Sequence, residues 1–498
     1  MGAPAGATPV ELDYPDDSSA SGQKNNTYAG TGGVAITSPF RRLLYAVKFQ
    51  EQKILLSSYI TPQSRILYDR GPRARVQKAA PWLTLDGDPY PAVIGGKIEW
   101  IVDGYTTSDG YPYSTGTTLG DATSDSVNAQ SQVVVAQQRS PINYIRNSVK
   151  ATVDAYNGTV TLYAWDASDP VLQTWSKAFP GTVQPRSAMP PDLVNHIRYP
   201  EDLFKVQREL FSKFHVTDAP SFYNGQDFWQ IPDDPTKTAS GKAQPPYYLS
   251  VKMPGTQSAA FSLTTAFAPT KRQTLAAFMA VNSEPGIDYG TIRVLRLPRN
   301  TTIPGPTQVQ NNFEANPTVS QQLTLLRNGG SQVTFGNLLS LPVAGGVLYV
   351  EPVYISSAAT GTSFPLLQRV LVAFGNNIGF QPTLGAAVNE VFSGNTTVTT
   401  PVAPGGSGGT SGGTGGSSTS TASASLVKAL ADAQLAYDQG QAALRRGDFT
   451  AYGQAQAKLA EALSRAQAAG DELARGGASP QATTSAAPTP TPSSTKTA

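Results

Sequence analysis

The sequence predicts an α+β fold in which helices pack on a mixed or antiparallel sheet, followed by a C-terminal αα-hairpin. Short apolar runs bounded by Pro or Gly recur along the chain, and most have the length of a strand. Apolar residues at helical spacing occur between some of these runs. Strands and helices do not alternate regularly and no internal repeat is found, which argues against a parallel βαβ sheet or a solenoid.

The composition excludes several classes of function. Of 498 residues, 37 are Lys or Arg and 35 are Asp or Glu, which gives a net charge of +2 with His neutral. This balance lacks the positive field of a nucleic-acid-binding protein, so we expect no nucleic acid partner. The chain has no cysteine and only two histidines, His196 and His215. Disulfides, zinc–cysteine sites and thiol nucleophiles are therefore excluded, and multi-histidine metal sites nearly so.

The polar composition indicates an exported protein. Charged residues make up only 14% of the chain, against roughly 25% in average soluble domains. Polarity comes instead from Ser, Thr, Asn, Gln, Gly and Pro. This composition, together with the missing cysteine, suits a bacterial protein outside the cytoplasm. No signal peptide is visible at residues 1–10, and no apolar run approaches the ~18 residues of a transmembrane helix. We therefore expect any targeting segment to lie outside this chain.

The N-terminal part is predicted to become ordered only after an aperiodic start. Residues 1–33 are rich in Gly, Ala, Ser and Asp, which predicts a disordered N-terminal arm. Ser38 suits a helix N-cap and Pro39 the first helical position. A second short helix is expected over 72–80. The apolar stripe of the first helix consists of Leu43, Leu44, Val47 and Phe49.

Two β-hairpins are predicted from their turn residues. Gly95-Gly96 forms the first turn, because both positions tolerate a positive φ. Asn157-Gly158 forms the second and is the strongest short signal for a type I′ turn. The polar segment 114–138 between them predicts a long loop. The four strands concerned are 90–93, 97–102, 149–155 and 160–164.

The remainder of the body, residues 34–394, is predicted to continue as one body or two lobes. Helices are expected over 170–179, 191–214, 317–328 and 382–392. Pro200 is expected at the first position of the second half of 191–214. Strands are expected over 276–281, 291–297, 347–355 and 369–374.

The C-terminal quarter is predicted to be a tethered helical pair. The Gly/Ser/Thr-rich segment 395–424 predicts a flexible linker. Two Ala-rich stripes over 425–474 predict the αα-hairpin, with Gly447 as the break and Asp448 as the second N-cap. Residues 475–498 have the composition of a disordered tail. Because the stripes bury little area, we expect a partner or a second copy to cover them.

Four carboxylates are the candidate catalytic residues. They lie on both sides of the first predicted hairpin, whose two ends should bring them together. Such a cluster could supply the acid and base for glycoside cleavage, or bind Ca²⁺ through its oxygens. The EF-hand spacing is absent, and Asp-Gly segments are also ordinary turn chemistry, which we favour. The four are Asp86, Asp88, Asp103 and Asp109.

Aromatic residues crowd the same region and are the candidate binding residues. Aromatic rings beside carboxylates can form a platform that stacks on sugar faces. Aromatic residues on strands also pack a sheet against its helices, and we favour this interpretation. No nucleophile elbow or phosphate-binding loop is present, and both histidines are expected in the core or at helix ends. The candidates are Trp82, Tyr90, Trp100, Tyr105, Tyr111 and Tyr113.

Several long aromatic-rich segments resemble the uncharacterised protein family UPF0182. They include SRILYDRGPRARVQKAAPWLTLDGDPYPAV (64–93), WIVDGYTTSDGYPYS (100–114), RYPEDLFKVQREL (198–210), GQDFWQIPDDP (225–235) and LYVEPVYI (348–355). The resemblance runs from about 34 to 394 and extends into the C-terminal helix pair. It implies an actinobacterial-type integral membrane protein whose N-terminal membrane helices are absent from this chain, which resembles the C-terminal extracytoplasmic part. No catalytic residues come with the family.

The resulting expectation is an extracytoplasmic module of a cell-membrane protein that binds an envelope component or a protein partner without catalysis. Two alternatives remain open. One is a carboxylate-dependent hydrolase or transferase acting on envelope glycan, and the other is a structural domain stabilised by Ca²⁺.

Overall fold

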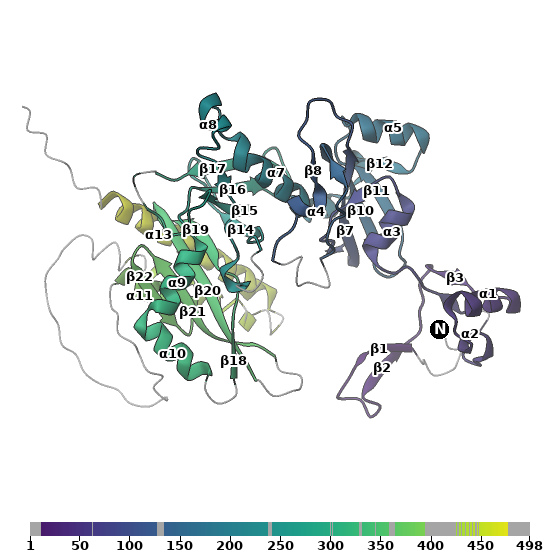
Figure 1. Cartoon of the computed structure of the whole chain (residues 1–498). Coiled ribbons are helices and arrows are strands. Elements are labelled where there is room, and N and C mark those ends of the chain that lie inside the picture. Colours follow the sequence, from purple (N-terminus) through teal and green to yellow (C-terminus); the bar gives the residue numbers. More distant parts are fainter. Residues whose placement is uncertain are drawn as a thin grey trace, which may run out of the picture. The chain divides into compact units, whose positions relative to one another are not determined.

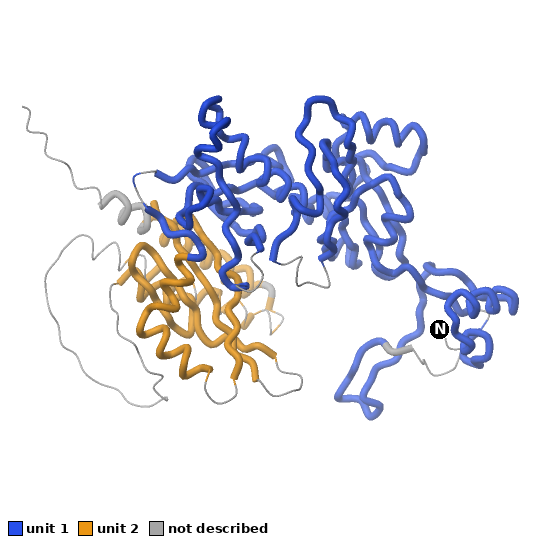
Figure 2. The backbone as a smooth tube through the Cα atoms, in the orientation of Figure 1, with its two compact units in different colours: residues 1–307 blue, residues 308–498 orange. Residues whose placement is uncertain are grey.

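The computed structural model describes residues 11–393 apart from 62, 127–133, 238–241, 299, 301, 328–330, 344 and 358–363, and also residues 448–476 with scattered residues over 425–446. The chain divides into two compact units, residues 1–307 and 308–498 (Figure 2). Helices combine with mainly antiparallel sheets in both units, which confirms the α+β prediction (Figure 1).

The first large sheet of unit 1 has six strands in the order β12-β11-β10-β7-β5, with β6 paired to β7. All its pairs are antiparallel except β11–β12. Gly95 and Gly96 have φ of 56° and 78°, which confirms the predicted two-residue turn. The strands are β5 (Thr84–Leu85), β6 (Tyr90–Ile94), β7 (Lys97–Ser108), β10 (Tyr144–Asp154), β11 (Val160–Ala164) and β12 (Val183–Pro185).

The second hairpin has the predicted strands but a different turn. Gly158 has a φ of 73°, whereas Asn157 does not have a positive φ, so the turn is not type I′. The Asp154 carboxylate instead accepts hydrogen bonds from the backbone N–H of Tyr156 at 2.8 Å and of Asn157 at 2.7 Å. The aspartate side chain therefore shapes a longer turn that the Asn-Gly pair alone does not specify.

The structure corrects the prediction of disorder for residues 11–33. This segment contains β1 (Glu11–Pro15) and β2 (Gln23–Asn26), which pair antiparallel. Tyr28 then packs on Tyr156 with ring centroids 5.0 Å apart. Composition alone missed these contacts because they join residues more than 120 positions apart. Two further short antiparallel pairs occur in the unit: β3 (Val34–Ala35) with β4 (Arg65–Ile66), and β8 (Thr117–Thr118) with β9 (Pro141–Ile142).

The first helix of unit 1 begins where its predicted capping residue lies. The Ser38 side chain accepts a hydrogen bond from the backbone N–H of Arg41 at 3.2 Å, which confirms the N-cap. The predicted helix 191–214 is in fact two helices, because Pro200 is extended and serves as the N-cap of the second. The helices are α1 (Pro39–Phe49), α2 (Lys53–Leu56), α3 (Pro72–Ala79), α4 (Leu119–Ala122), α5 (Pro170–Ala178), α6 (Pro191–Asn195), α7 (Glu201–Phe214) and α8 (Ala219–Tyr223).

The second large sheet of unit 1 has the order β13-β15-β16-β17, with β14 paired to β15. Helix α7 contacts both this sheet and β10 of the first sheet. Phe204 of α7 is fully buried in a core that includes Phe267 and Met279. The sequence did not predict β14 or β15. The strands are β13 (Trp229–Gln230), β14 (Tyr247–Val251), β15 (Ala260–Pro269), β16 (Ala277–Asn282) and β17 (Ile292–Arg296).

Unit 2 contains a third antiparallel sheet, ordered β18-β20-β21-β22 with β19 paired to β20. Helix α11 (Leu384–Ser393) packs on β21 and β22 and buries Ala387 and Val391 against Val372. Helix α10 (Pro317–Arg327) was predicted, whereas α9 (Pro306–Ala315) was not. The strands are β18 (Ser331–Phe335), β19 (Leu339–Val343), β20 (Gly346–Ser357), β21 (Leu366–Phe374) and β22 (Asn377–Gln381).

The C-terminal helix α13 (Phe449–Gly476) begins where the sequence predicts. The Asp448 carboxylate accepts a hydrogen bond from the backbone N–H of Ala451 at 2.9 Å. Arg465 pairs with Asp432 at 2.8 Å and so links α13 to the preceding helical residues. The predicted linker 395–424, and the tail beyond residue 476, lie outside the described residues.

We expect Asp448→Ala to destabilise the start of α13 by about 1 kcal/mol, since it removes the N-cap acceptor. Hydrogen exchange of the first turn of α13 measures the effect. Asp432→Ala is the matched control, because it breaks an exposed pair whose contribution is about 0–1 kcal/mol and removes no cap. Equal exchange in the parent chain and Asp448→Ala would show that this cap does not hold the helix.

Candidate functional site

A network of buried charges surrounds the start of α7 in unit 1. The Asp86 carboxylate, just after β5, accepts hydrogen bonds from the Tyr105 hydroxyl and from the backbone N–H of Asp202 at 3.1 Å. The Asp202 carboxylate in turn accepts from the backbone N–H of Gly87 at 2.8 Å. Helix α7 has no side-chain cap of its own, so Asp86 satisfies one of its unpaired N–H groups.

The second part of the network joins the two central strands of the first sheet. Asp103 of β7 and Lys150 of β10 lie directly opposite one another and form a salt bridge in which both side chains are buried. Lys150 Nζ also donates to the Arg198 carbonyl and to the Tyr289 hydroxyl, each at 3.2 Å. Burial raises the pKa of Asp103, and the Lys150 charge opposes that rise.

Helix α7 contributes a third group of buried charges. Lys205 Nζ lies 2.7 Å from the Asp125 carboxylate and 2.8 Å from that of Glu201. These carboxylates raise the pKa of Lys205 above its usual range, although burial alone would lower it. Burial and the nearby Asp86 carboxylate raise the pKa of Asp202 to about 7, which Lys205 only partly opposes.

The structure therefore brings three of the four candidate carboxylates into one region and separates the fourth. Asp88 forms a salt bridge with Arg198 at 2.7 Å. Asp86 and Asp103 are only 2% and 4% exposed, and the backbone N–H of Asp86 donates to the Asp103 carbonyl at 2.9 Å. Asp109 is exposed beyond the end of β7. It lies six positions after Asp103 along the chain, a span of about 20 Å in extended strand. The expected cluster of four is wrong because Asp103 lies within β7 rather than after it.

The converging carboxylates do not fit the predicted Ca²⁺ site. Their oxygens already accept hydrogen bonds from Tyr105, Asn147 and the ammonium group of Lys150. Among the residues that the structure describes, no group of three or more His, Asp or Glu side chains could hold a metal ion. The Lys150 ammonium group already occupies the position beside Asp103 at which a cation would have to bind.

The six candidate aromatic residues do not form one platform. Tyr105 is fully buried, and Trp100 packs against the core of the first sheet. Trp82 stacks on Trp175 of α5 with ring centroids 5.6 Å apart. In the remaining set, Tyr111 is exposed and stacks on Tyr144, Tyr113 is fully exposed, and Tyr90 lines a cleft.

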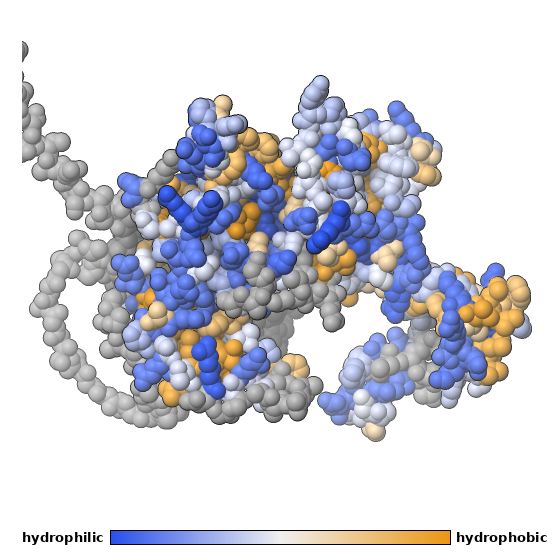
Figure 3. Space-filling view, in the orientation of Figure 1, coloured by the Kyte–Doolittle hydropathy of each residue, from blue (hydrophilic) through white to orange (hydrophobic). Residues whose placement is uncertain are grey.

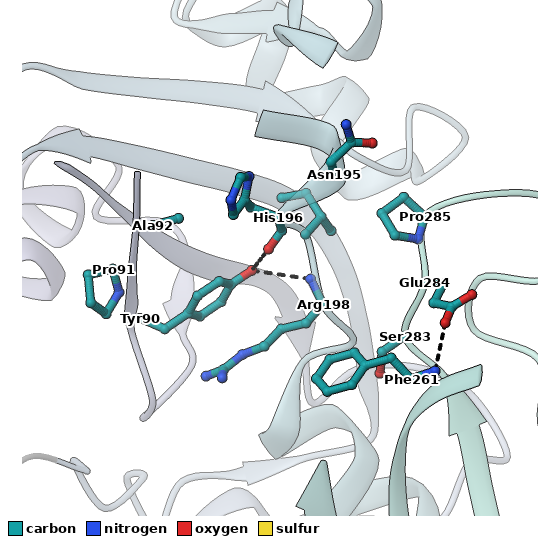
Figure 4. Close-up of a pocket in the computed structure, with 11 residues that line it drawn as sticks. Tyr90, Pro91, Ala92, Asn195, His196, Arg198, Phe261, Ser283, Glu284 and Pro285 are labelled. Atoms are coloured by element: carbon teal, nitrogen blue, oxygen red, sulfur yellow. Dashed lines mark hydrogen bonds between the residues drawn. The ribbon is translucent and has the colours of Figure 1, made fainter. Parts of the chain in front are cut away.

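This cleft of about 410 Å³ is the candidate binding site (Figure 4). Its size lies within the range of small-molecule sites. One wall comes from β6, a second from the end of α6 and the residues after it, and a third from β15 and the loop after β16. The Tyr90 hydroxyl ties the first two walls together, because it accepts from the backbone N–H of Arg198 and donates to the His196 carbonyl, each at 3.2 Å. The lining residues are Tyr90, Pro91, Ala92, Asn195, His196, Ile197, Arg198, Phe261, Ser283, Glu284 and Pro285.

The cleft presents a small set of polar groups. The Ser283 side-chain oxygen is buried and has no hydrogen-bond partner among the described residues. One Glu284 oxygen accepts from the backbone N–H of Phe261 at 2.8 Å. His196 Nδ1 donates to the Asp192 carbonyl at 2.7 Å, which leaves Nε2 as an acceptor when the ring is neutral. Arg198 is not free, since it pairs with Asp88 and lies over the Tyr90 ring at 3.8 Å.

Sequence reasoning did not identify most of this cleft. Phe261 of β15 and Ser283 and Glu284 of the loop after β16 lie more than 160 residues after Tyr90, and β15 itself was not predicted. His196 was predicted in the core or at a helix end, and its contact with Asp192 does close α6.

Comparison with known proteins identifies the family. The sequence profile of "Uncharacterised protein family (UPF0182)" matches residues 3–326. The chain belongs to the UPF0182 family. The match begins earlier and ends earlier than the resemblance over 34–394 had indicated.

Curated UPF0182 proteins from actinobacteria are similar to this chain at about half identity. The identity is 52% with a protein of Streptomyces coelicolor over 93% of this chain and 45% of the relative. It is 54% with a protein of Frankia alni over 92% and 45%, and 49% with one of Leifsonia xyli over 94% and 51%. The chain thus spans about half the length of these relatives. No solved structure matches.

Helices long and apolar enough to cross a membrane are not found among the described residues of this UPF0182 chain.

Proposed function

We propose that this UPF0182 chain is the extracytoplasmic part of a cell-membrane protein and binds a saccharide component of the cell envelope without catalysis. The low charge and the missing cysteine support a location outside the cytoplasm. Relatives about twice as long leave room for membrane-spanning segments elsewhere in such a protein.

The observation that carries the proposal is that the candidate carboxylates already have partners inside the fold. Cleavage of a glycoside needs two carboxyl groups that both reach the substrate. Asp86 and Asp103 are buried and engaged by Tyr105 and Lys150, and neither lines the cleft. These residues therefore hold α7 and the first sheet together, away from the cleft.

The lining of the cleft favours a polyhydroxylated ligand. The Phe261 ring and the Pro91 and Pro285 rings offer flat apolar surface for a sugar face. The Asn195 amide and the second Glu284 oxygen can exchange hydrogen bonds with hydroxyl groups.

We expect the chain to sediment with purified actinobacterial cell wall, and Asn195→Ala/Glu284→Ala to weaken this binding by at least about tenfold. Asp109→Ala is the matched control, because it removes an exposed carboxylate remote from the cleft. Far-UV circular dichroism shows whether each variant is folded.

The same samples are assayed for new reducing ends. Release of reducing ends that Asp103→Asn abolishes would overturn the non-catalytic assignment. Equal sedimentation of the cleft variant and the Asp109 control would place any binding outside the cleft.

A further inference from the structure

Helix α1 presents its apolar side to solvent, the reverse of a surface helix in a globular protein. Phe40 and Val47 are each 68% exposed, and Leu44 is 52% exposed. At 100° per residue these side chains share one face of the helix with Leu43. The face toward the protein is formed instead by Ala46 and by Arg42, which donates to the Ile60 carbonyl at 2.9 Å. The polar anchor and the exposed apolar face fix the orientation of α1.

The exposed apolar surface continues into the next segment. Helix α2 has no buried residue, and Leu56 is 77% exposed. Tyr59 follows and is also exposed. Figure 3 shows hydrophobic residues gathered over α1 and α2 at the right edge of the view. We call this surface the α1–α2 face, defined by Phe40, Leu43, Leu44, Val47, Leu55, Leu56 and Tyr59.

Positive charge borders this face. Residues 37–68 contain five cationic side chains and a single acid, Glu51. Arg41 and Lys48 lie at one edge of the α1 stripe by helical spacing, and both are exposed. Lys53 opens α2 and is exposed as well. A partner that covers the face must therefore be apolar at its centre and negative at its rim.

We propose that the α1–α2 face docks on an anionic lipid surface. A convex helix face with large aliphatic and aromatic residues, flanked by Lys and Arg, matches the chemistry of interfacial helices, which sink about 5–10 Å into the headgroup region. A second copy of the chain fits less well, because a two-fold contact would bring the cations of both copies into the same interface. The inference does not depend on the saccharide cleft.

The test is sedimentation of the full chain with vesicles of phosphatidylcholine containing one quarter phosphatidylglycerol. We expect binding that weakens in high salt and is much weaker to pure phosphatidylcholine. Leu44→Ser/Val47→Ser should weaken binding to the anionic vesicles by on the order of tenfold. The matched control is Val93→Ser/Ile98→Ser, which removes two similarly exposed apolar side chains from the β6–β7 hairpin.

A second variant distinguishes the loss of positive charge from a loss of the folded apolar face. Arg41→Gln/Lys48→Gln keeps the apolar face and should reduce binding to anionic vesicles while leaving weak binding to neutral vesicles unchanged. No sedimentation of the parent chain with anionic vesicles, or equal loss in the hairpin control, would overturn the proposal. So would a lipid-free dimer that Leu44→Ser/Val47→Ser dissociates in light scattering, since it would show that a second copy covers the face.

Discussion

Lys150→Ala is expected to destabilise unit 1 by about 3–5 kcal/mol, because it leaves the Asp103 carboxylate buried without a counter-charge. Both side chains are almost inaccessible, so water cannot replace the lost ammonium group. The substitution also removes the donors to Arg198 and Tyr289. A loss of this size is a large part of the 5–15 kcal/mol that stabilises an ordinary domain.

Urea unfolding followed by tryptophan fluorescence measures this effect in unit 1 alone, because all five tryptophans lie between residues 82 and 229. Lys78→Ala is the matched control, since it breaks an exposed pair with Asp69 and should cost about 0–1 kcal/mol. Equal costs for the two variants would contradict the view that the buried pair holds the sheet. The destabilisation caused by Lys150→Ala should become smaller in acid, because protonation removes the unpaired charge of Asp103.

Local patterns in the sequence predicted many elements of the fold. Ser38, Gly95-Gly96 and Asp448 each specify a cap or turn through their own backbone or side-chain chemistry, and the structure confirms all three. Elements that depend on distant partners were missed. Strand β15 is buried between β14 and β16 and has an almost continuous apolar and Thr-rich sequence without clear alternation.

The candidate site was less predictable for a related reason. Asp86 and Asp88 were rightly placed near Asp103, because a hairpin brings its ends together. The lysines that neutralise such carboxylates could not be assigned, since Lys150 reaches Asp103 only through the β7–β10 register and Lys205 only through the placement of α7. Asp109 was misplaced because the length of β7 was underestimated.

We expect the stability of unit 1 to fall as the pH rises from about 4 to above 7, with Asp202 as the main cause. The folded state holds the Asp202 proton up to a pKa of about 7, whereas the unfolded chain releases it near 4. Between these values the folded state binds more protons, so its stability is full below pH 4 and decreases through pH 7. The difference of about three between the folded and unfolded pKa of Asp202 corresponds to roughly 4 kcal/mol in the free energy of unfolding.

Other buried carboxyl groups with raised pKa values change the stability in the same direction. Carboxyl groups with lowered pKa values affect it in a different pH range. Burial raises the pKa of Asp88 and of Glu201, which adds to the loss of stability above pH 4. Hydrogen bonds lower the pKa of Asp169 although its side chain is buried, so its contribution to stability is lost only in stronger acid, below the usual range of an aspartate. The window between pH 4 and 7 therefore reports on the carboxyl groups with raised pKa values and excludes Asp169.

Asp202→Asn tests the assignment, because an amide cannot ionise yet its oxygen can still accept from Gly87 and from Gln137. Its urea midpoint, read by tryptophan fluorescence, should vary much less between pH 5 and pH 8 than that of the parent chain. Lys205 keeps Asp125 and Glu201 as partners, so the variant leaves no buried cation unpaired. Asp109→Asn changes an exposed carboxylate and should retain the full slope. A parent chain that gains stability from pH 5 to pH 8 would mean that Asp202 is ionised throughout, with Lys205 outweighing both burial and the nearby Asp86.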